Sequence, residues 1–115
     1  MITGVGIDMI EVARIQKAVE RNVRFVDRVF TPGEIAYSEG KKSRFLHLAA
    51  RFAAKEAFFK AIGRRVSLTD VEVTNLPSGQ PLLVVHTKED FDFTRTFVSL
   101  SHLADYAVAV VVLEK

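Results

Sequence analysis

Apolar residues recur every three or four positions through much of the first half of the chain and every second position through the second half. The longest helical pattern covers residues 43–62, is rich in alanine, and ends at Gly63, a residue type that commonly follows the last helical turn. Beyond residue 70 the change to a period of two predicts four strands. These strands cover residues 71–74, 82–85, 97–100 and 106–113.

The N-terminal segment begins with a strand over residues 2–7, in which Gly4 and Gly6 indicate a bulge or a close approach of another backbone. Asp8, followed three residues later by Glu11, resembles a capping box and predicts that a helix begins there. We expect this helix to continue to about residue 22.

Two further helical segments precede the long helix. Residues 23–30 carry apolar positions that predict a second helical piece. Thr31 and Glu34 form another capping box, with proline at the first helical position, and predict a short helix through residue 37. One strand, then helices, then antiparallel strands define an α+β fold, and 115 residues suit a single domain over residues 1–115.

The strands carry two further signals. Residues 75–81, NLPSGQP, are typical of a hairpin connection. Residues 107–112 are apolar at every position, so the last strand should be central in its sheet or lie at an interface.

The composition excludes several classes of protein. Without cysteine, the chain has no disulfide framework, thiolate metal site or cysteine nucleophile. It has no basic leader and no apolar run near the ~20 residues of a membrane span, so we expect a cytoplasmic protein with no membrane partner. The net charge of +2 conceals a balance of +6 over residues 1–65 and −4 over residues 66–115, which indicates an acidic partner for the basic part.

Charged residues gather on one side of the predicted long helix. Arg51 and Lys55 share a stripe, while Glu56 and Lys60 lie on the next stripe, about 100° away. They are either a solvated face with a Glu56–Lys60 ion pair or the polar side of a site. Asp8 is open to two interpretations of its own: it caps a helix, or, beside a glycine-containing strand end, it faces a ligand.

The three histidines differ in context. His47 and His86 occupy positions that we expect to be exposed and without companions, which does not favour a zinc site. His102 ends the hydroxyl-rich segment SLSH, where a capped turn and a binding role both fit the sequence.

Five cations spaced three or four residues apart follow the first two helical pieces. They are Arg14, Lys17, Arg21, Arg24 and Arg28. If the two pieces are roughly continuous, these cations form one stripe, either a solvated face or a docking site for an acidic helix or loop. A non-enzymatic nucleic-acid-binding module is an alternative, but Phe25 and Phe30 fall on the apolar side and leave the stripe without a stacking platform. We therefore expect no nucleic-acid partner.

Five segments stand out in order: GVGIDMIEVARI (4–15), FTPGEIAY (30–37), ARFAAKEAFFKAIG (50–63), PSGQP (77–81) and SLSH (99–102). In this order and spacing they resemble the holo-[acyl-carrier-protein] synthase family of small bacterial phosphopantetheinyl transferases. The resemblance covers essentially the whole chain. Its most specific part is the block FAAKEAFFKAIG combined with an N-terminal GID.

The resemblance implies the 4′-phosphopantetheinyl transferase fold, an antiparallel sheet packed on one long helix and shorter N-terminal helices. It implies Mg²⁺-dependent transfer of the 4′-phosphopantetheine arm from coenzyme A to a serine of apo acyl carrier protein, for fatty acid biosynthesis. Adenosine 3′,5′-bisphosphate is the other product. Asp8 and Glu56 are the implied metal ligands, and Mg²⁺ suits such a pair because it often takes only one or two protein carboxylates. Lys60 is implied to hold the pyrophosphate, and Glu56 or Asp8, directly or through water, to accept the serine proton.

The same resemblance assigns residues to the two substrates. The implied coenzyme A-binding residues are Arg51, Lys60, Gly63, Gly79, Gln80, Pro81, Ser101 and His102. Arg14, Arg21 and Arg24 match the basic helix that docks the acidic helix of the carrier protein. Members of this size resemble trimers, so we expect a homotrimer with active sites at protomer interfaces.

Two positions depart from the family pattern. The glycine-rich tract after the long helix is shortened and more basic here, with Arg64 and Arg65 placed to reach a phosphate instead. Phe59 stands where a small polar residue is common. A family member that serves a carrier of secondary metabolism is an alternative that the sequence does not separate from one serving fatty acid synthesis.

Overall fold

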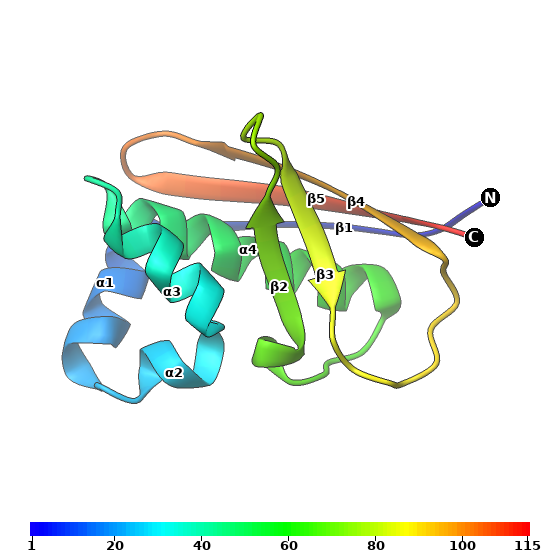
Figure 1. The fold of residues 1–115 in the computed structure, drawn as a ribbon, viewed down its shortest axis with the longest axis horizontal. Coiled ribbons are helices and arrows are strands. Elements are labelled where there is room, and N and C mark those ends of the chain that lie inside the picture. The colour runs from blue at the N-terminus through cyan, green and yellow to red at the C-terminus, as the bar shows by residue number, and fades with distance from the viewer.

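The long helix predicted over residues 43–62 forms as α4 (Arg44–Ile62), and the other elements are arranged around it (Figure 1). The computed structural model describes all of residues 1–115. In chain order the other elements are β1 (Ile2–Glu11), α1 (Val12–Arg21), α2 (Phe25–Val29), α3 (Pro32–Glu39), a 3₁₀ turn (Leu68–Asp70), β2 (Val71–Asn75), β3 (Pro81–Val85), β4 (Arg95–His102) and β5 (Tyr106–Glu114). This content confirms the predicted α+β fold class.

The main sheet is antiparallel, with the strand order β1–β5–β4, so β5 is central. Alternate residues of β5 are buried where the sheet packs against α4, namely Ala107, Ala109, Val111 and Leu113. The packing on α4 accounts for the apolar residues on that face, whereas Val108, Val110 and Val112 on the other face are only partly buried. The helix also contacts β2, which pairs with β3 in a separate hairpin, so α4 lies between the sheet and the hairpin (Figure 1).

The first strand is longer than the sequence predicted, and the capping box predicted at Asp8 is wrong. β1 continues to Glu11, because residues 4–11 pair in register with β5, including Asp8 with Ala109. The helix α1 begins at Val12, and Glu11 at its N-cap makes no side-chain capping bond. Pairing with the central strand β5 gives these backbone N–H and C=O groups the hydrogen-bond partners that a capped helix would otherwise have provided. Such long-range pairing cannot be read from four neighbouring residues.

Two local signals are confirmed. The Thr31 hydroxyl accepts a hydrogen bond from the Glu34 backbone, and the Glu34 carboxylate accepts one from the Thr31 backbone, which completes the predicted capping box of α3. Gly63 ends α4 with φ of 76°, a left-handed conformation that favours glycine. Both signals depend only on residues close in sequence.

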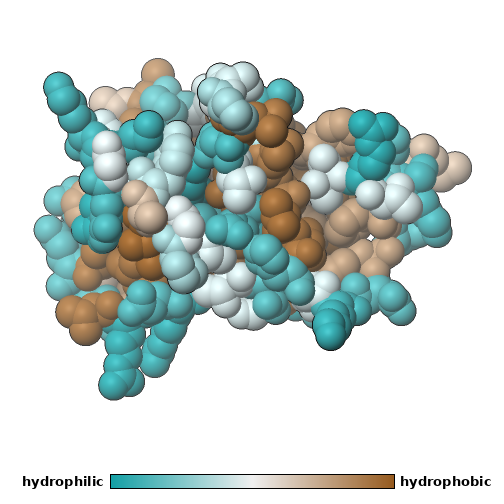
Figure 2. Space-filling view, viewed as in Figure 1, coloured by the Kyte–Doolittle hydropathy of each residue, from teal (hydrophilic) through white to brown (hydrophobic).

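The two basic helical pieces are not continuous. Asn22 ends α1 in an extended conformation, with φ of −140° and ψ of 106°, and α2 begins only at Phe25. The predicted single stripe of five cations is therefore divided between two helices. Figure 2 shows hydrophilic side chains projecting at the lower left, where Figure 1 places α1 and α2. None of the helices combines the length and the apolar character needed to cross a membrane.

Candidate active site

Two glycines of β1 allow α4 to lie directly against the strand. A Cβ atom built on Gly6 would be 1.9 Å from the Ala57 carbonyl oxygen, and one on Gly4 would be 2.2 Å from the Ala61 carbonyl oxygen. The close backbone approach that the sequence predicted is thus confirmed. Side chains alternate along a strand, so Asp8 shares the α4-facing side with the two glycines. The glycines thereby bring the helix within reach of Asp8.

The α4-facing carboxylate of Asp8 pairs with a lysine of that helix. Lys60 Nζ lies 3.1 Å from Asp8 Oδ1 and also donates a hydrogen bond of 2.9 Å to the Ile7 carbonyl oxygen. Asp8 is largely covered, whereas the Lys60 side chain is 57% exposed. The Lys60 ammonium is therefore held by Asp8 and the Ile7 carbonyl oxygen, while the side chain remains accessible to an incoming ligand.

The second carboxylate, Glu56, pairs with an arginine that follows the helix. Arg65 donates two parallel hydrogen bonds of 2.9 Å, one to each oxygen of Glu56, and these bonds with the carboxylate charge raise the pKa of Arg65. The Glu56–Lys60 pair that helical spacing offered does not form, because each residue has another partner. Sequence reasoning identified Arg65 only as a cation able to reach a phosphate.

The two carboxylates line one cleft. Asp8 and Glu56 border a cavity of about 370 Å³ together with Arg14, Phe25 and Phe52, among others. Glu56 also borders an adjoining cavity of about 290 Å³, lined further by Phe59, Lys60, Gly63, Arg64 and Arg65. The predicted site residues Asp8, Glu56 and Lys60 thus come together, with Gly63 beside them.

The two carboxylates fit Mg²⁺, which needs few protein ligands, better than they fit a metal ion whose ligands all come from the protein. No three Asp, Glu, His or Cys side chains are grouped closely enough to hold an ion on their own. Asp8 and Glu56 supply hard oxygen atoms from two elements around an open cleft. Mg²⁺ keeps several water ligands and is commonly bound by one or two carboxylates together with substrate phosphates.

Arg51 belongs to a second group of residues on the hairpin side of α4. Its side chain is buried, and burial lowers the pKa of Arg51 despite nearby Glu34. It donates a 2.6 Å hydrogen bond to Asn75 Oδ1, and Asn75 Nδ2 donates to the Gly79 carbonyl oxygen at 2.9 Å. Gly79 adopts φ of 93° in the turn that ends with Gln80. The structure therefore links Arg51 to the predicted Gly79–Pro81 loop through Asn75.

His102 and His47 extend this second group, and the prediction that His47 has no companions is wrong. The His47 ring lies 6.4 Å from the His102 ring and 5.5 Å from the Tyr37 ring, and Tyr37 in turn stacks under Arg51 at 4.1 Å. Burial, followed by the positive charges around it, lowers the pKa of His47. His102 ends β4 rather than a capped turn, because it pairs with Ala107 of β5.

His86 also has a partner that the sequence did not reveal. Its Nε2 atom lies 2.9 Å from Glu72 Oε1, across the β2–β3 hairpin. Ser101 and His102 line another cavity of about 220 Å³ with Met9 and Tyr106. The cleft at Asp8 and Glu56 and the cavity at Arg51 share no lining residue. The predicted coenzyme A-binding residues therefore form separate groups within the chain.

Lys55 is not part of a polar face. Its side chain is fully buried and pairs with Glu34 at 2.6 Å, while its ammonium donates to the carbonyl oxygens of Val29 and Leu68. Glu34 also accepts a hydrogen bond from the Val73 backbone. Lys55 shares a helical stripe with Arg51, which suggested that it lies on a charged, exposed face. Instead, three segments from other parts of the chain cover the Lys55 side chain.

Comparison with known proteins identifies the class. Residues 4–111 match the family model of the 4′-phosphopantetheinyl transferase superfamily. The chain belongs to this superfamily. It is 50% identical over 125 residues to a protein of Geobacter sulfurreducens named holo-[acyl-carrier-protein] synthase, a match that covers 100% of this chain and 99% of the relative.

Solved structures agree with this placement. A holo-(acyl-carrier-protein) synthase of Bacillus anthracis, solved in complex with CoA (3′,5′-ADP), is 40% identical, with a TM-score of 0.85 over 100% of this chain and 98% of that chain. The Helicobacter pylori holo-[acyl-carrier-protein] synthase in complex with coenzyme A is 35% identical, with a TM-score of 0.85 over 96% of this chain and 99% of that chain. The resemblance to the synthase family, the fold and the phosphopantetheinyl transferase class are confirmed.

Proposed function

We propose that this chain transfers the 4′-phosphopantetheine arm of coenzyme A to a serine of apo acyl carrier protein at the cleft formed by Asp8, Glu56 and Lys60. The observation that carries the proposal is the meeting of Asp8 and Glu56, from two distant segments, in one cleft beside Lys60. The matched synthases and their coenzyme A complexes support the choice of substrates.

The chemistry assigns a role to each of these residues. Asp8 and Glu56 are the proposed ligands of Mg²⁺, which when bound supplies positive charge to the pyrophosphate. The serine oxygen forms a bond to the β-phosphorus, and the bond to the oxygen of the 5′-phosphate breaks, releasing adenosine 3′,5′-bisphosphate. Lys60 stabilises the charge on that leaving group, and Glu56 or Asp8 accepts the serine proton directly or through water.

The remaining proposed coenzyme A-binding residues serve the nucleotide. They are Arg51, Gly63, Gly79, Gln80, Pro81, Ser101 and His102. Arg51 supplies positive charge and hydrogen-bond donors for phosphates, His102 supplies a ring N–H donor, and the Gly79 loop offers backbone groups. The cleft at Asp8 and the cavity at Arg51 share no lining residue, which favours a ligand held between two protomers.

The outer face of the main sheet supports self-association, and we propose the homotrimer that the family resemblance implies. Three β1 side chains that point away from α4, Val5, Ile7 and Met9, are 59%, 60% and 66% exposed, and Phe97 of β4 is 42% exposed. Together with Val108, Val110 and Val112 of β5 they form a continuous apolar surface of the kind found at protein interfaces. In an Ile7→Glu variant we expect a monomer mass in light scattering and a loss of coenzyme A binding. A monomeric wild-type protein contradicts the trimer.

Three arginines are proposed to dock the acidic carrier helix. Arg14 lines the cleft of Asp8, while Arg21 and Arg24 are exposed around the junction of α1 and α2. An Arg21→Glu variant is expected to raise the KM for the carrier protein by about tenfold, because attraction becomes repulsion, with the KM for coenzyme A unchanged. Equal changes in both constants contradict a separate docking surface.

The central test is mass spectrometry of apo carrier protein after incubation with this protein, coenzyme A and Mg²⁺. The carrier should gain the mass of one phosphopantetheine arm, and a chelator should prevent the gain. Asp8→Asn and Glu56→Gln variants should fold normally and lose transfer, whereas near-normal transfer by either contradicts the metal assignment. Parallel assays with a fatty acid carrier and a secondary-metabolism carrier identify the preferred partner. The cytoplasmic location stays a prediction.

A further inference from the structure

One of the two proposed metal ligands is occupied by an arginine. Arg65 approaches Glu56 as a fork, with both carboxylate oxygens engaged at 2.9 Å. The guanidinium also lies over the Phe59 ring, with its central carbon 4.9 Å from the ring centre. Such bidentate pairs have defined geometry, and while this one is intact neither oxygen is fully available to a metal ion.

The contact is well suited to exchange. The Arg65 side chain is 64% exposed and the Glu56 side chain 17% exposed, and an ion pair open to water on one side contributes little stability. Arg65 follows the left-handed Gly63 by two residues, so it lies in a loop rather than in the helix. Arg65 also lines the cavity bordered by Lys60, and the Phe59 ring beneath its guanidinium lines the same cavity.

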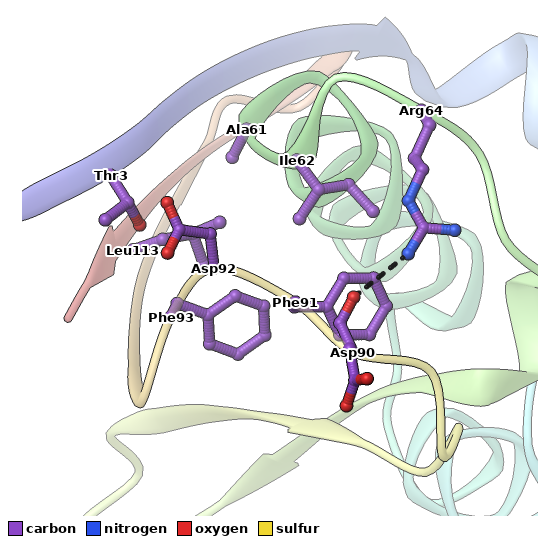
Figure 3. A pocket seen from close by; sticks show the side chains of 9 residues that line it. All are labelled: Thr3, Ala61, Ile62, Arg64, Asp90, Phe91, Asp92, Phe93 and Leu113. Carbon is purple, nitrogen blue, oxygen red and sulfur yellow. Dashed lines mark hydrogen bonds between the residues drawn. The ribbon is translucent and has the colours of Figure 1, made fainter.

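The neighbouring arginine is held elsewhere. Arg64 pairs with Glu89 at 2.6 Å, donates to the Asp90 carbonyl oxygen and lies over the Phe91 ring. Figure 3 shows its side chain directed from the end of α4 toward Asp90, at a cavity of about 120 Å³. Arg65 is therefore the loop cation that contacts the proposed metal site, and Arg64 provides a matched comparison.

The charges of metal and pyrophosphate are opposite and equal in this cleft. Asp8 and Glu56 face Lys60 and Arg65, and Arg14 lines the same cleft. A divalent cation added alone makes the cleft more positive by two charges, and a pyrophosphate dianion added alone makes it more negative by two. Both ligands together leave the net charge of the cleft unchanged. Uncompensated charge in a partly buried cleft is costly, so each ligand should favour the binding of the other.

From this geometry, and resting on the proposed function, we propose that Arg65 is an exchangeable substrate-binding residue. It holds Glu56 while no metal is bound, and it turns to the coenzyme A pyrophosphate when Asp8 and Glu56 bind a divalent cation. The residue thereby couples the binding of metal and coenzyme A. Phe59 serves as the platform over which the guanidinium moves.

Mn²⁺ binding provides a readout that does not depend on activity. Titration followed by electron paramagnetic resonance gives the Kd for Mn²⁺, and calorimetry with Mn²⁺ in excess gives the Kd for coenzyme A. Arg65→Gln frees Glu56, so the Kd for Mn²⁺ without coenzyme A should fall about threefold. The Kd for coenzyme A should rise about tenfold, because a charge-assisted contact to phosphate is lost. Arg65→Lys keeps the positive charge but cannot donate two parallel hydrogen bonds, so its affinity for coenzyme A should lie between those of the wild type and Arg65→Gln.

Arg64→Gln is the control for the loop, and its Kd for Mn²⁺ should match that of the wild type. Unchanged or weaker Mn²⁺ binding by Arg65→Gln, or unchanged coenzyme A binding, overturns the exchange, and the loss of both affinities indicates a merely structural arginine. If the wild-type protein binds Mn²⁺ and coenzyme A, and Arg65→Gln changes neither Kd, the exchange is refuted but the proposed function stands. A wild type that binds neither ligand refutes the proposed function itself.

Discussion

The contact of Gly6 with α4 leads to a prediction for stability and for catalysis together. An alanine Cβ at this position would be 1.9 Å from the Ala57 carbonyl oxygen, whereas real Cβ atoms essentially never come within 3.0 Å of another heavy atom. The obstructing atom belongs to the backbone, so no change of rotamer relieves the clash. In a Gly6→Ala variant the helix must therefore retreat from β1 by about 1 Å, because closely packed interiors have no free volume to absorb the methyl group.

This displacement has two measurable consequences. Overpacking a core typically costs 1–3 kcal/mol, so the free energy of unfolding should fall by about 2 kcal/mol. The retreat also moves Glu56 and Lys60 away from Asp8, and a misplacement of about 1 Å at a reacting centre can reduce the rate about 100-fold. Urea denaturation followed by circular dichroism measures the first effect, and mass spectrometry of carrier modification measures the second.

Gly40 provides a matched control. Its φ is −78°, and the nearest atom to an added Cβ is 3.8 Å away, so alanine fits there without strain. Gly40→Ala should keep full activity and gain about 0.4–1 kcal/mol, because alanine restricts the unfolded chain. If Gly6→Ala unfolds at the wild-type urea midpoint and transfers at the wild-type rate, the close packing of α4 on β1 does not control the site.

Three further predictions concern other parts of the fold. Lys55→Met should lower the free energy of unfolding by about 3–5 kcal/mol, because it leaves the buried Glu34 carboxylate without its counter-ion; a change below 1 kcal/mol in urea denaturation refutes this. Thr31→Ala should cost about 0.5–2 kcal/mol or more, because it removes both the cap and the hydroxyl's hydrogen bond to Glu72, whereas Ser43→Ala should cost almost nothing, because Ser43 makes no capping bond; equal losses contradict the capping argument. The lowered pKa of His47 means that the folded state resists its protonation, so stability should fall as the pH drops below about 6.5 until the folded-state pKa is passed. His47→Gln should flatten this part of the pH profile, and an identical slope in thermal melts rules out His47 as its source.

The sequence was most informative where structure depends on near neighbours. The Thr31–Glu34 capping box, the helix end at Gly63 and the β2–β3 hairpin all formed as predicted, since each depends on residues within a few positions. The glycines of β1 also indicated a close backbone approach, although not the helix that makes it. Local chemistry thus predicted most elements and several of their boundaries.

Prediction failed where distant segments compete with local signals. Asp8 has the spacing of a cap, yet pairing with Ala109 keeps it in a strand. Lys55 has the spacing of a polar stripe, but Glu34 and two backbone carbonyls allow its burial. Helical spacing paired Glu56 with Lys60, whereas the fold gives each another partner. For Asp8, Lys55 and Lys60 the deciding group lies far away in the sequence, and for Glu56 it is Arg65, nine residues on and beyond the end of the helix, so helical periodicity contains no information about it.

The central position of β5 also has a consequence for how the protein folds during its synthesis. β1 pairs with no strand other than β5, and β5 follows it by about 100 residues in the sequence. At a synthesis rate of ~5–20 residues per second, the ribosome therefore makes β5 several seconds after β1. Throughout that interval the apolar face with Val5, Ile7 and Met9 lacks its neighbouring strand, and Asp8 has no sheet to orient it. The outer face of β1 should therefore stay without its neighbouring strand until β5 has been made, and the proposed catalytic cleft should assemble only near the end of translation.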